Sequence, residues 1–195
     1  MKTITTTLTT TAEFSEDGKK RYLLNKVWDD KKPRLAIIML APSEASGIEL
    51  DSTTLLVLNN ASRLGYGSVS VLNLFSTVGN IKECFAEEND KENLKYISKT
   101  AETADTIVYA SGVGKATNKS FIKRQNQVLD ILKKHENKLM CLSNKEGNAR
   151  FQHQDSSCSY YTARAFFVNW RNPQRKATHG TLATKRISAW TKAAG

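Results

Sequence analysis

The chain of 195 residues contains little cysteine, and its three cysteines stand far apart. Cys84, Cys141 and Cys158 form no C-x-x-C pair. A small, odd and scattered set of thiols argues for a reducing compartment. It argues against a disulfide scaffold, an iron–sulfur cluster and a cysteine-based zinc site.

Long apolar runs are also missing. The longest block, LAIIMLAP, is bracketed by Arg34 and Ser43 and is much shorter than the roughly 18 residues that a membrane span needs. The N-terminal MKTITTTLTTT lacks the apolar core of a signal peptide. Hydrophobic residues make up 39% of the chain and charged residues 25%, which suits a packed core. We therefore expect a soluble, cytoplasmic protein with one domain over residues 1–195.

Acidic residues are absent after Asp155, although the chain as a whole has 19 of them against 29 Lys and Arg. Residues 156–195 form a basic C-terminal segment with interleaved tyrosine, phenylalanine and tryptophan. Cations that meet phosphates and aromatic rings that stack on bases are what a nucleic-acid surface requires. The alternative is a solvated tail that only aids solubility, and charge alone does not decide between them. The basic residues are Arg164, Arg171, Arg175, Lys176, Lys185, Arg186 and Lys192.

The apolar pattern predicts an α/β fold. The first 30 residues favour a β-hairpin around the turn EDGK. After it, short apolar runs alternate with helical patterns, which is typical of βαβ units. We expect a three-layer α/β/α domain with a central four-stranded, mainly parallel sheet, preceded by the N-terminal hairpin. The runs are 35–40, 68–75, 105–111 and 138–143, and the helical patterns are 52–64, 90–104 and 117–134.

In such a fold the site lies at the carboxyl ends of the strands. Gly112-Val113-Gly114-Lys115 follows the third run and has the look of a phosphate-binding loop. However, the full pattern needs Gly and Ser or Thr where this chain has Tyr109 and Ala116. We therefore interpret this segment as a tight turn before a helix.

Asn73 and His153 are the polar side chains that stand out near strand ends. A carboxamide at the end of an apolar strand is costly to bury unpaired, and its donor and acceptor suit the edge of a pyrimidine. Tying down a neighbouring loop is the alternative role for Asn73. His153, in a serine-rich loop, could donate a hydrogen bond to a developing anion or simply bond within its loop. Nothing in the sequence places Cys158 beside it as a thiol nucleophile.

Three motifs carry a resemblance to a known family. The strand end Ile38–Ser43, the helix start Asp51-Ser52-Thr53 and the strand from Gly65-Tyr66 to Asn73-Leu74-Phe75 resemble a prokaryotic, uncharacterised domain family with an IMLNPS-like motif. This resemblance covers residues 12–153. Through that family the chain is similar to the uracil-DNA glycosylase superfamily.

The similarity to the glycosylases rests on three short stretches. Residues 40–43 (LAPS) are similar to the pocket loop G-x-x-P-G, and residues 69–73 (VSVLN) to the strand whose Asn recognises uracil. Residues 153–159 (HQDSSCS) are similar to the H-P-S-P-L-S loop that enters the minor groove. Ala41 departs from the family, which has Asp or Asn at the position that orients water.

The resemblance implies hydrolysis of the N-glycosidic bond of a uracil flipped out of single- or double-stranded DNA, without metal or organic cofactor. Asn73 would read the base and His153 would donate to the leaving anion. With Ala41 unable to act, Glu44 or Asp51 would position water. Pro42 and Ser43 would shape the uracil pocket, and Phe75 or Tyr66 would stack on the base. DNA contacts would come from Ser156, Ser157, Arg164, Arg171, Arg175 and Lys176.

The same resemblance implies a protein inhibitor of glycosylases as a further partner, and no membrane. A second reading is a catalytically weak module that binds DNA or a protein through the basic segment. Ala41 favours that reading, and the presence of both Asn73 and His153 opposes it. A third reading, an enzyme of free nucleotides or nucleosides, would not need the basic segment.

Overall fold

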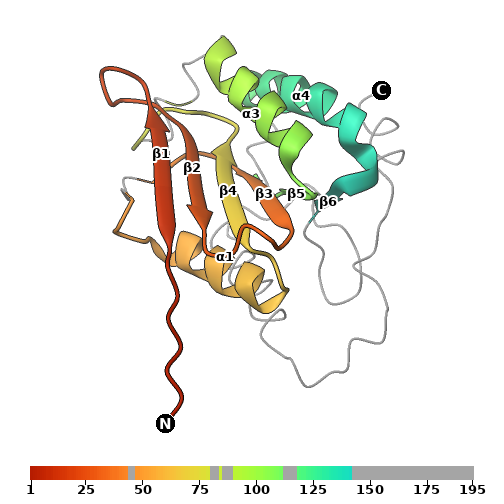
Figure 1. Ribbon diagram of the computed structural model, residues 1–195. Coiled ribbons are helices and arrows are strands. Elements are labelled where there is room, and N and C mark those ends of the chain that lie inside the picture. Colours follow the sequence, from red (N-terminus) through yellow and green to blue (C-terminus); the bar gives the residue numbers. More distant parts are fainter. Residues whose placement is uncertain (44–46, 80–83, 85–89, 112–117, 142–195) are drawn as a thin grey trace.

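The computed structural model describes residues 1–43, 47–79, 84, 90–111 and 118–141 (Figure 1). Every apolar run and helical pattern named above corresponds to a strand or helix in it. No helix among these residues is both long and apolar enough to cross a membrane. The elements are β1 (Thr9–Phe14), β2 (Arg21–Val27), β3 (Arg34–Met39), α1 (Ser52–Arg63), β4 (Ser68–Asn73), α3 (Lys91–Thr103), β5 (Thr106–Tyr109), α4 (Lys119–Leu132), a 3₁₀-helix (Lys133–Lys138) and β6 (Leu139–Cys141).

The sheet has six strands in the order β1-β2-β4-β3-β5-β6 and is mixed. The expected parallel part is present, because β4, β3, β5 and β6 run in the same direction. The sheet has six strands and not the four expected, because the hairpin that precedes them in the sequence also belongs to it. Strand β2 pairs antiparallel with β4, with Leu24 opposite Val71, so the hairpin extends the same sheet.

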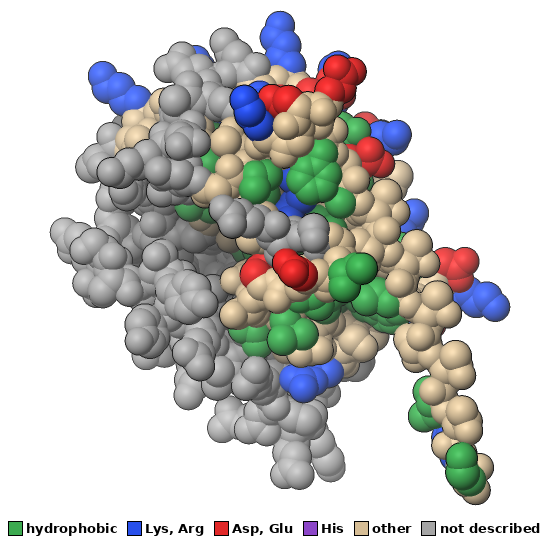
Figure 2. Space-filling model, turned by 90° about the vertical axis from the view of Figure 1, so that its left-hand side faces the viewer, with side chains coloured by type: hydrophobic (Ala, Val, Ile, Leu, Met, Phe, Trp, Pro, Cys, Tyr) green, Lys and Arg blue, Asp and Glu red, His purple; other side chains and the backbone are tan. Residues whose placement is uncertain are grey.

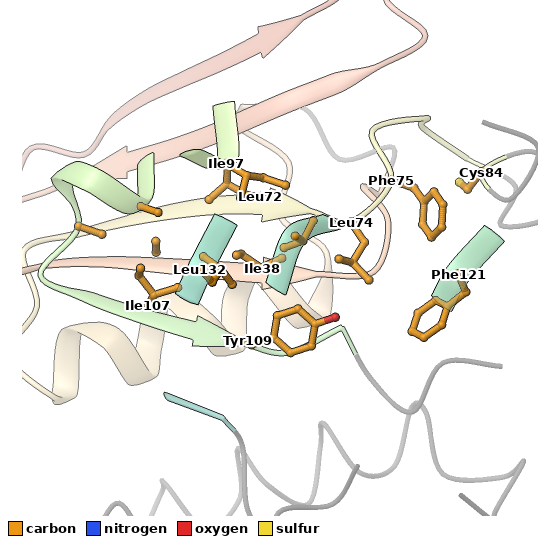
Figure 3. Close-up of a cluster of buried hydrophobic side chains, with 14 residues drawn as sticks. Ile38, Leu72, Leu74, Phe75, Cys84, Ile97, Ile107, Tyr109, Phe121 and Leu132 are labelled. Atoms are coloured by element: carbon orange, nitrogen blue, oxygen red, sulfur yellow. The ribbon is translucent and has the colours of Figure 1, made fainter. Parts of the chain in front are cut away.

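Helices cover both faces of the sheet: α1 lies on one side, and α3 and α4 lie together on the other (Figure 1). Along β3, Leu35 and Ile37 pack in the cluster that includes residues of α1, whereas Ala36 and Ile38 pack in the cluster that includes residues of α3 and α4. Figure 3 shows the second cluster. Each fully buried Leu or Ile contributes about 1.5–3 kcal/mol, which explains why the central strands form unbroken apolar runs in the sequence.

The helices begin at the carboxyl edge of the sheet, because each follows a strand. The N-caps of α1, α3 and α4 are Asp51, Asp90 and Asn118, and each side chain accepts a hydrogen bond from a backbone amide of its first turn. Such caps typically stabilise a helix by about 1 kcal/mol. After α1, Gly65 has φ of 86° and so takes the left-handed conformation that turns the chain back into β4. The polar groups of this edge are therefore concentrated around helix starts.

Candidate functional site

The ends of β3 and β4 lie side by side at the carboxyl edge. Met39 is opposite Asn73, and the ladder continues beyond both strands. The backbone amide of Leu74 donates to the carbonyl of Met39 (2.8 Å), and the amide of Phe75 donates to the carbonyl of Leu40 (3.1 Å). The segment that contains Pro42 therefore starts where Asn73 ends its strand.

The side chain of Asn73 lies on the α1 face of the sheet. Val69 and Val71, which precede it at intervals of two along β4, pack in the same cluster as residues of α1. Asn73 is 1% exposed, and its Nδ2 has no hydrogen-bond partner among the described residues. An unpaired buried amide costs about 1–3 kcal/mol.

The two other buried asparagines of the described chain use their amides differently. Asn60 donates from Nδ2 to the carbonyl of Leu56 (2.8 Å). Asn93 donates from Nδ2 to the carbonyls of Asn73 (2.9 Å) and Leu74 (3.1 Å). Both leave a side-chain oxygen unpaired, whereas Asn73 leaves the NH₂ donor unpaired. The NH₂ group of Asn73, a buried donor without an acceptor at the end of a strand, can therefore bind the carbonyl oxygen of a ligand.

Asp51 joins the helix start to the segment after β3. Its Oδ1 accepts from the amides of Thr53 (2.8 Å) and Thr54 (2.9 Å), and its Oδ2 accepts from the hydroxyls of Thr54 (2.8 Å) and Ser43 (2.7 Å). Burial acts to raise the pKa of this carboxyl, but the hydrogen bonds, led by that of Ser43, outweigh it and lower the pKa. A carboxylate has about four acceptor sites, and in Asp51 these four hydrogen bonds occupy all of them. No acceptor site of Asp51 is left for the predicted positioning of a water molecule.

Two buried cations of β2 hold the segment that follows β3. Arg21 is 2% exposed and donates from Nη1 to the carbonyl of Ser43 (3.4 Å). Lys26 is also 2% exposed, and its Nζ donates to the carbonyl of Gly47 (2.7 Å) and to Oγ1 of Thr10 (2.9 Å). Sequence reasoning missed both, because a cation in a strand is normally a surface residue and no motif marks these two. We call Arg21, Ser43, Asp51 and Asn73 the α1-side cluster.

A second polar cluster lies at the same edge on the other face. Asp90 caps α3 by accepting from the amide of Asn93 (3.1 Å), and it also accepts from the hydroxyl of Ser76. Arg124 of α4 donates from Nε to the carbonyl of Leu74 (2.7 Å) and from Nη2 to the carbonyl of Asp90 (3.0 Å). This α3-side cluster (Ser76, Asp90, Asn93 and Arg124) was not predicted, although an Asp three residues before Asn93 is a recognisable helix cap.

The aromatic residues predicted to stack on a base lie elsewhere. Phe75 is 1% exposed and sits near Cys84 and Phe121 in the cluster under α3 and α4 (Figure 3). The ring therefore has no open face in this structure. Tyr66 donates its hydroxyl to Oγ1 of Thr106 (3.0 Å) at the beginning of β5, which is the opposite edge of the sheet. Neither ring is therefore placed to stack on a base bound at Asn73.

The other predicted site residues fall outside the described residues. In the part that is described, charged side chains of both signs are interspersed over the face shown in Figure 2. The described residues contain no group of three or more His, Cys, Asp or Glu that could hold a metal ion. The predicted residues that lie outside are Glu44, His153, Ser156, Ser157, Arg164, Arg171, Arg175 and Lys176.

Comparison with known proteins gives a family and a distant structural match. The family model described as "Protein of unknown function (DUF1643)" matches residues 21–153. No curated protein matches the chain. A GTP-binding protein from the hyperthermophilic archaeon Sulfolobus solfataricus, solved in complex with GDP, matches with 10% identity and a TM-score of 0.29. The match covers 71% of this chain and 42% of that one, so this chain spans less than half of that protein.

Proposed function

The chain belongs to the DUF1643 family, and we propose that it is a DNA glycosylase that removes a uracil flipped out of DNA. The observation that carries the proposal is the buried, unpaired Nδ2 of Asn73 at the carboxyl edge of the sheet. A ligand carbonyl would complete this donor and remove the cost of burying it unpaired. Uracil offers a carbonyl oxygen where cytosine offers an amino group, so the donor favours uracil.

The surroundings of Asn73 support a pocket at this place. Pro42 is buried and Ser43 is half-buried, and both come shortly after the end of β3, the strand that pairs with β4. These are the residues whose similarity to the pocket loop of uracil-DNA glycosylases suggested a wall around the base.

The proposed reaction breaks the bond between C1′ of the deoxyribose and N1 of uracil. Uracil leaves as an anion with the electron pair of the broken bond, and water adds to C1′ of the sugar, which develops positive charge. The added water loses a proton to solvent, and the uracil anion takes one up, so that the products are an abasic sugar and neutral uracil. His153 donates a hydrogen bond to the leaving anion. Glu44 positions the water, because the oxygens of Asp51 already accept four hydrogen bonds. Loss of an anion donor of this kind typically costs about 100- to 1,000-fold in rate.

The basic C-terminal segment supplies the proposed DNA contacts. Reversing the charges of Arg171, Arg175 and Lys176 should weaken duplex binding. It should also reduce the slope of log affinity against log salt by about 0.9 for each phosphate that the variant no longer neutralises. An unchanged affinity and slope would leave the segment as a solubility feature only.

The decisive experiment incubates the full chain with single- and double-stranded oligonucleotides that carry one uracil, followed by alkali to cleave abasic sites. We expect cleavage at uracil and none at cytosine. Asn73→Ala should lower excision about 100-fold. Asn60→Ala is the matched control, because it removes another buried amide from the far half of α1. Absence of cleavage by the wild type contradicts the activity, and equal losses in the two variants contradict the role of Asn73.

A further inference from the structure

A β-bulge in β2 changes the direction of Arg21. Leu23 is opposite Glu13 and Arg21 is opposite Phe14, so Tyr22 is an extra residue in the pairing of β1 with β2. Bulges are frequent near functional sites because they re-aim a side chain. This one lies at the carboxyl edge, where β2 begins beside the end of β4.

The bulge places two consecutive side chains on the α3 face. The ring of Tyr22 stacks on that of Tyr96 in α3, with centroids 5.2 Å apart and an interplanar angle of 8°. Leu23 packs against the cluster under α3 and α4. In a regular strand Arg21 would share the face of Leu23. Instead it reaches the carbonyl of Ser43 on the α1 side.

Ser43 is consequently held through two of its groups. Its carbonyl accepts from Nη1 of Arg21 (3.4 Å), and its hydroxyl donates to Oδ2 of Asp51 (2.7 Å). Burial lowers the pKa of Arg21, and the negative charge of Asp51 acts in the opposite direction with a smaller effect. Arg21 is buried and Asp51 is half-buried, and partly buried opposite charges are weak net stabilisers compared with apolar residues of similar volume. The main consequence of Arg21 and Asp51 is therefore that they fix the position of Ser43, and not that they add stability.

We propose that Arg21 and Asp51 are positioning residues, which together fix Ser43 and with it the wall of the pocket beside Asn73. The inference rests on the proposed function for its activity measurement. Arg21 and Asp51 touch no reacting atom in this scheme. They act through Ser43, which follows Leu40 closely in the chain, and Leu40 is hydrogen-bonded through its carbonyl to the segment after Asn73. A wall displaced by about 1 Å can cost up to about 100-fold in rate.

The test compares Arg21→Met and Asp51→Asn with Asp90→Asn. Asn is a good N-cap, so Asp51→Asn keeps the start of α1 while removing the charge. Asp90→Asn makes the same change at the cap of α3 on the other face. At a temperature where every variant is folded, we expect Arg21→Met and Asp51→Asn to lower kcat on a uracil oligonucleotide about 10-fold or more. Asp90→Asn should lower the melting temperature while its kcat stays close to that of the wild type.

Two further variants distinguish positioning from mere stability. Arg21→Lys keeps the charge but not the planar fork, so its kcat should lie between those of wild type and Arg21→Met. The double variant Arg21→Met/Asp51→Asn should be no slower than the slower single variant, since both changes release the same residue. The proposal would be overturned if the kcat losses of the two single variants multiplied in the double variant. It would also be overturned if Asp90→Asn lost as much kcat as Arg21→Met or Asp51→Asn.

Amide hydrogen exchange tests the inference without any substrate. In Arg21→Met the amide of Phe75, which donates to the carbonyl of Leu40, should exchange about 10-fold faster than in wild type, while the amide of Asn93, which donates to Asp90, should not change. If the wild type cleaves no uracil oligonucleotide, the proposed function fails but this measurement still decides the positioning role. Unchanged exchange at Phe75 would refute it.

Discussion

The two faces of the sheet carry a similar polar arrangement at their carboxyl edge. On each face an aspartate caps a helix and accepts a hydrogen bond from a serine that follows a strand. The serine is Ser43 on the α1 side and Ser76 on the α3 side. Each face also has a buried arginine that donates to a backbone carbonyl of the same region. The difference between the clusters therefore lies in what these groups surround.

On the α3 side the donors meet the carbonyls of the chain itself. Arg124 and Asn93 both donate to the carbonyl of Leu74, and Phe75 and Phe121 fill the space nearby. On the α1 side the amide donor of Asn73 meets no acceptor among the described residues. One arrangement therefore serves two purposes. The closed side, where the amide donor of Asn93 is met and only its side-chain oxygen is not, holds the fold, and the side with an unmet donor is the one suited to a ligand.

The largest loss of stability should come from removing Arg124, the buried arginine of the α3 side. Arg124→Met leaves the carbonyls of Leu74 and Asp90 without their guanidinium donor in a buried place. We expect the free energy of unfolding to fall by about 3–5 kcal/mol, measured by urea denaturation. Arg34→Met is the control, because Arg34 is exposed and its pair with Asp105 should contribute about 0–1 kcal/mol. Similar losses in the two variants would contradict the structural role of Arg124.

A smaller loss should follow from Asn93→Leu. This change removes the amide that donates to the carbonyls of Asn73 and Leu74 while keeping a similar side-chain volume. Two buried acceptors lose a donor, so the free energy of unfolding should fall by about 2–3 kcal/mol. Denaturation in urea at neutral pH measures it. A neutral result would show that these carbonyls find other donors and that the α3-side cluster is not closed.

Acid should destabilise both clusters. Burial opposes ionisation of Asp51 and Asp90, but their hydrogen bonds outweigh it and lower both pKa values in the folded state. The unfolded chain then binds more protons near its own carboxyl pKa of about 3.9, so this stability is present above that pH and is lost as the pH falls through the folded pKa. Melting temperatures between about pH 5 and pH 3 should drop more steeply in wild type than in Asp51→Asn or Asp90→Asn. Equal slopes of melting temperature against pH in wild type and variants would argue against the lowered pKa values of Asp51 and Asp90.

The smallest effect on stability should be a gain, whereas the changes above all cause a loss. Asn73→Leu replaces an unpaired buried amide with an apolar group on the face that packs against α1. Stability should be unchanged or higher by up to about 1 kcal/mol, while uracil excision is lost. Thermal melting and the oligonucleotide assay on the same sample measure both. A clear loss of stability would show that Asn73 is a structural residue like Asn93.

The local elements could be predicted because their signals are local. The apolar run 35–40 and the helical spacing over 52–64 depend on neighbouring residues, and both correspond closely to β3 and α1. The pairing of β2 with β4 joins Leu24 to Val71 across many residues, and no short pattern specifies it. For this reason the sequence did not show that the hairpin joins the sheet.

The candidate site was predicted only where a single residue type was unusual for its place. Asn73 stood out as an amide in an apolar strand, and it is indeed buried at the strand end. Arg21 and Arg124 gave no such signal, because arginine is common on surfaces and its burial depends on the bulge at Tyr22 and on the packing of α4. The motifs also could not show that Phe75 turns its ring toward the face opposite Asn73.

The position of β4 between β2 and β3 has a consequence for the order of folding. The hairpin β1-β2 is local and can form as soon as its own residues are free to pair, but its partner strand comes only after β3 and α1 in the chain. Closing that longer loop is slower than forming the hairpin. We therefore expect Arg21 to dock against Ser43 only after the βαβ unit has assembled, so that the wall of the proposed pocket is completed late in folding.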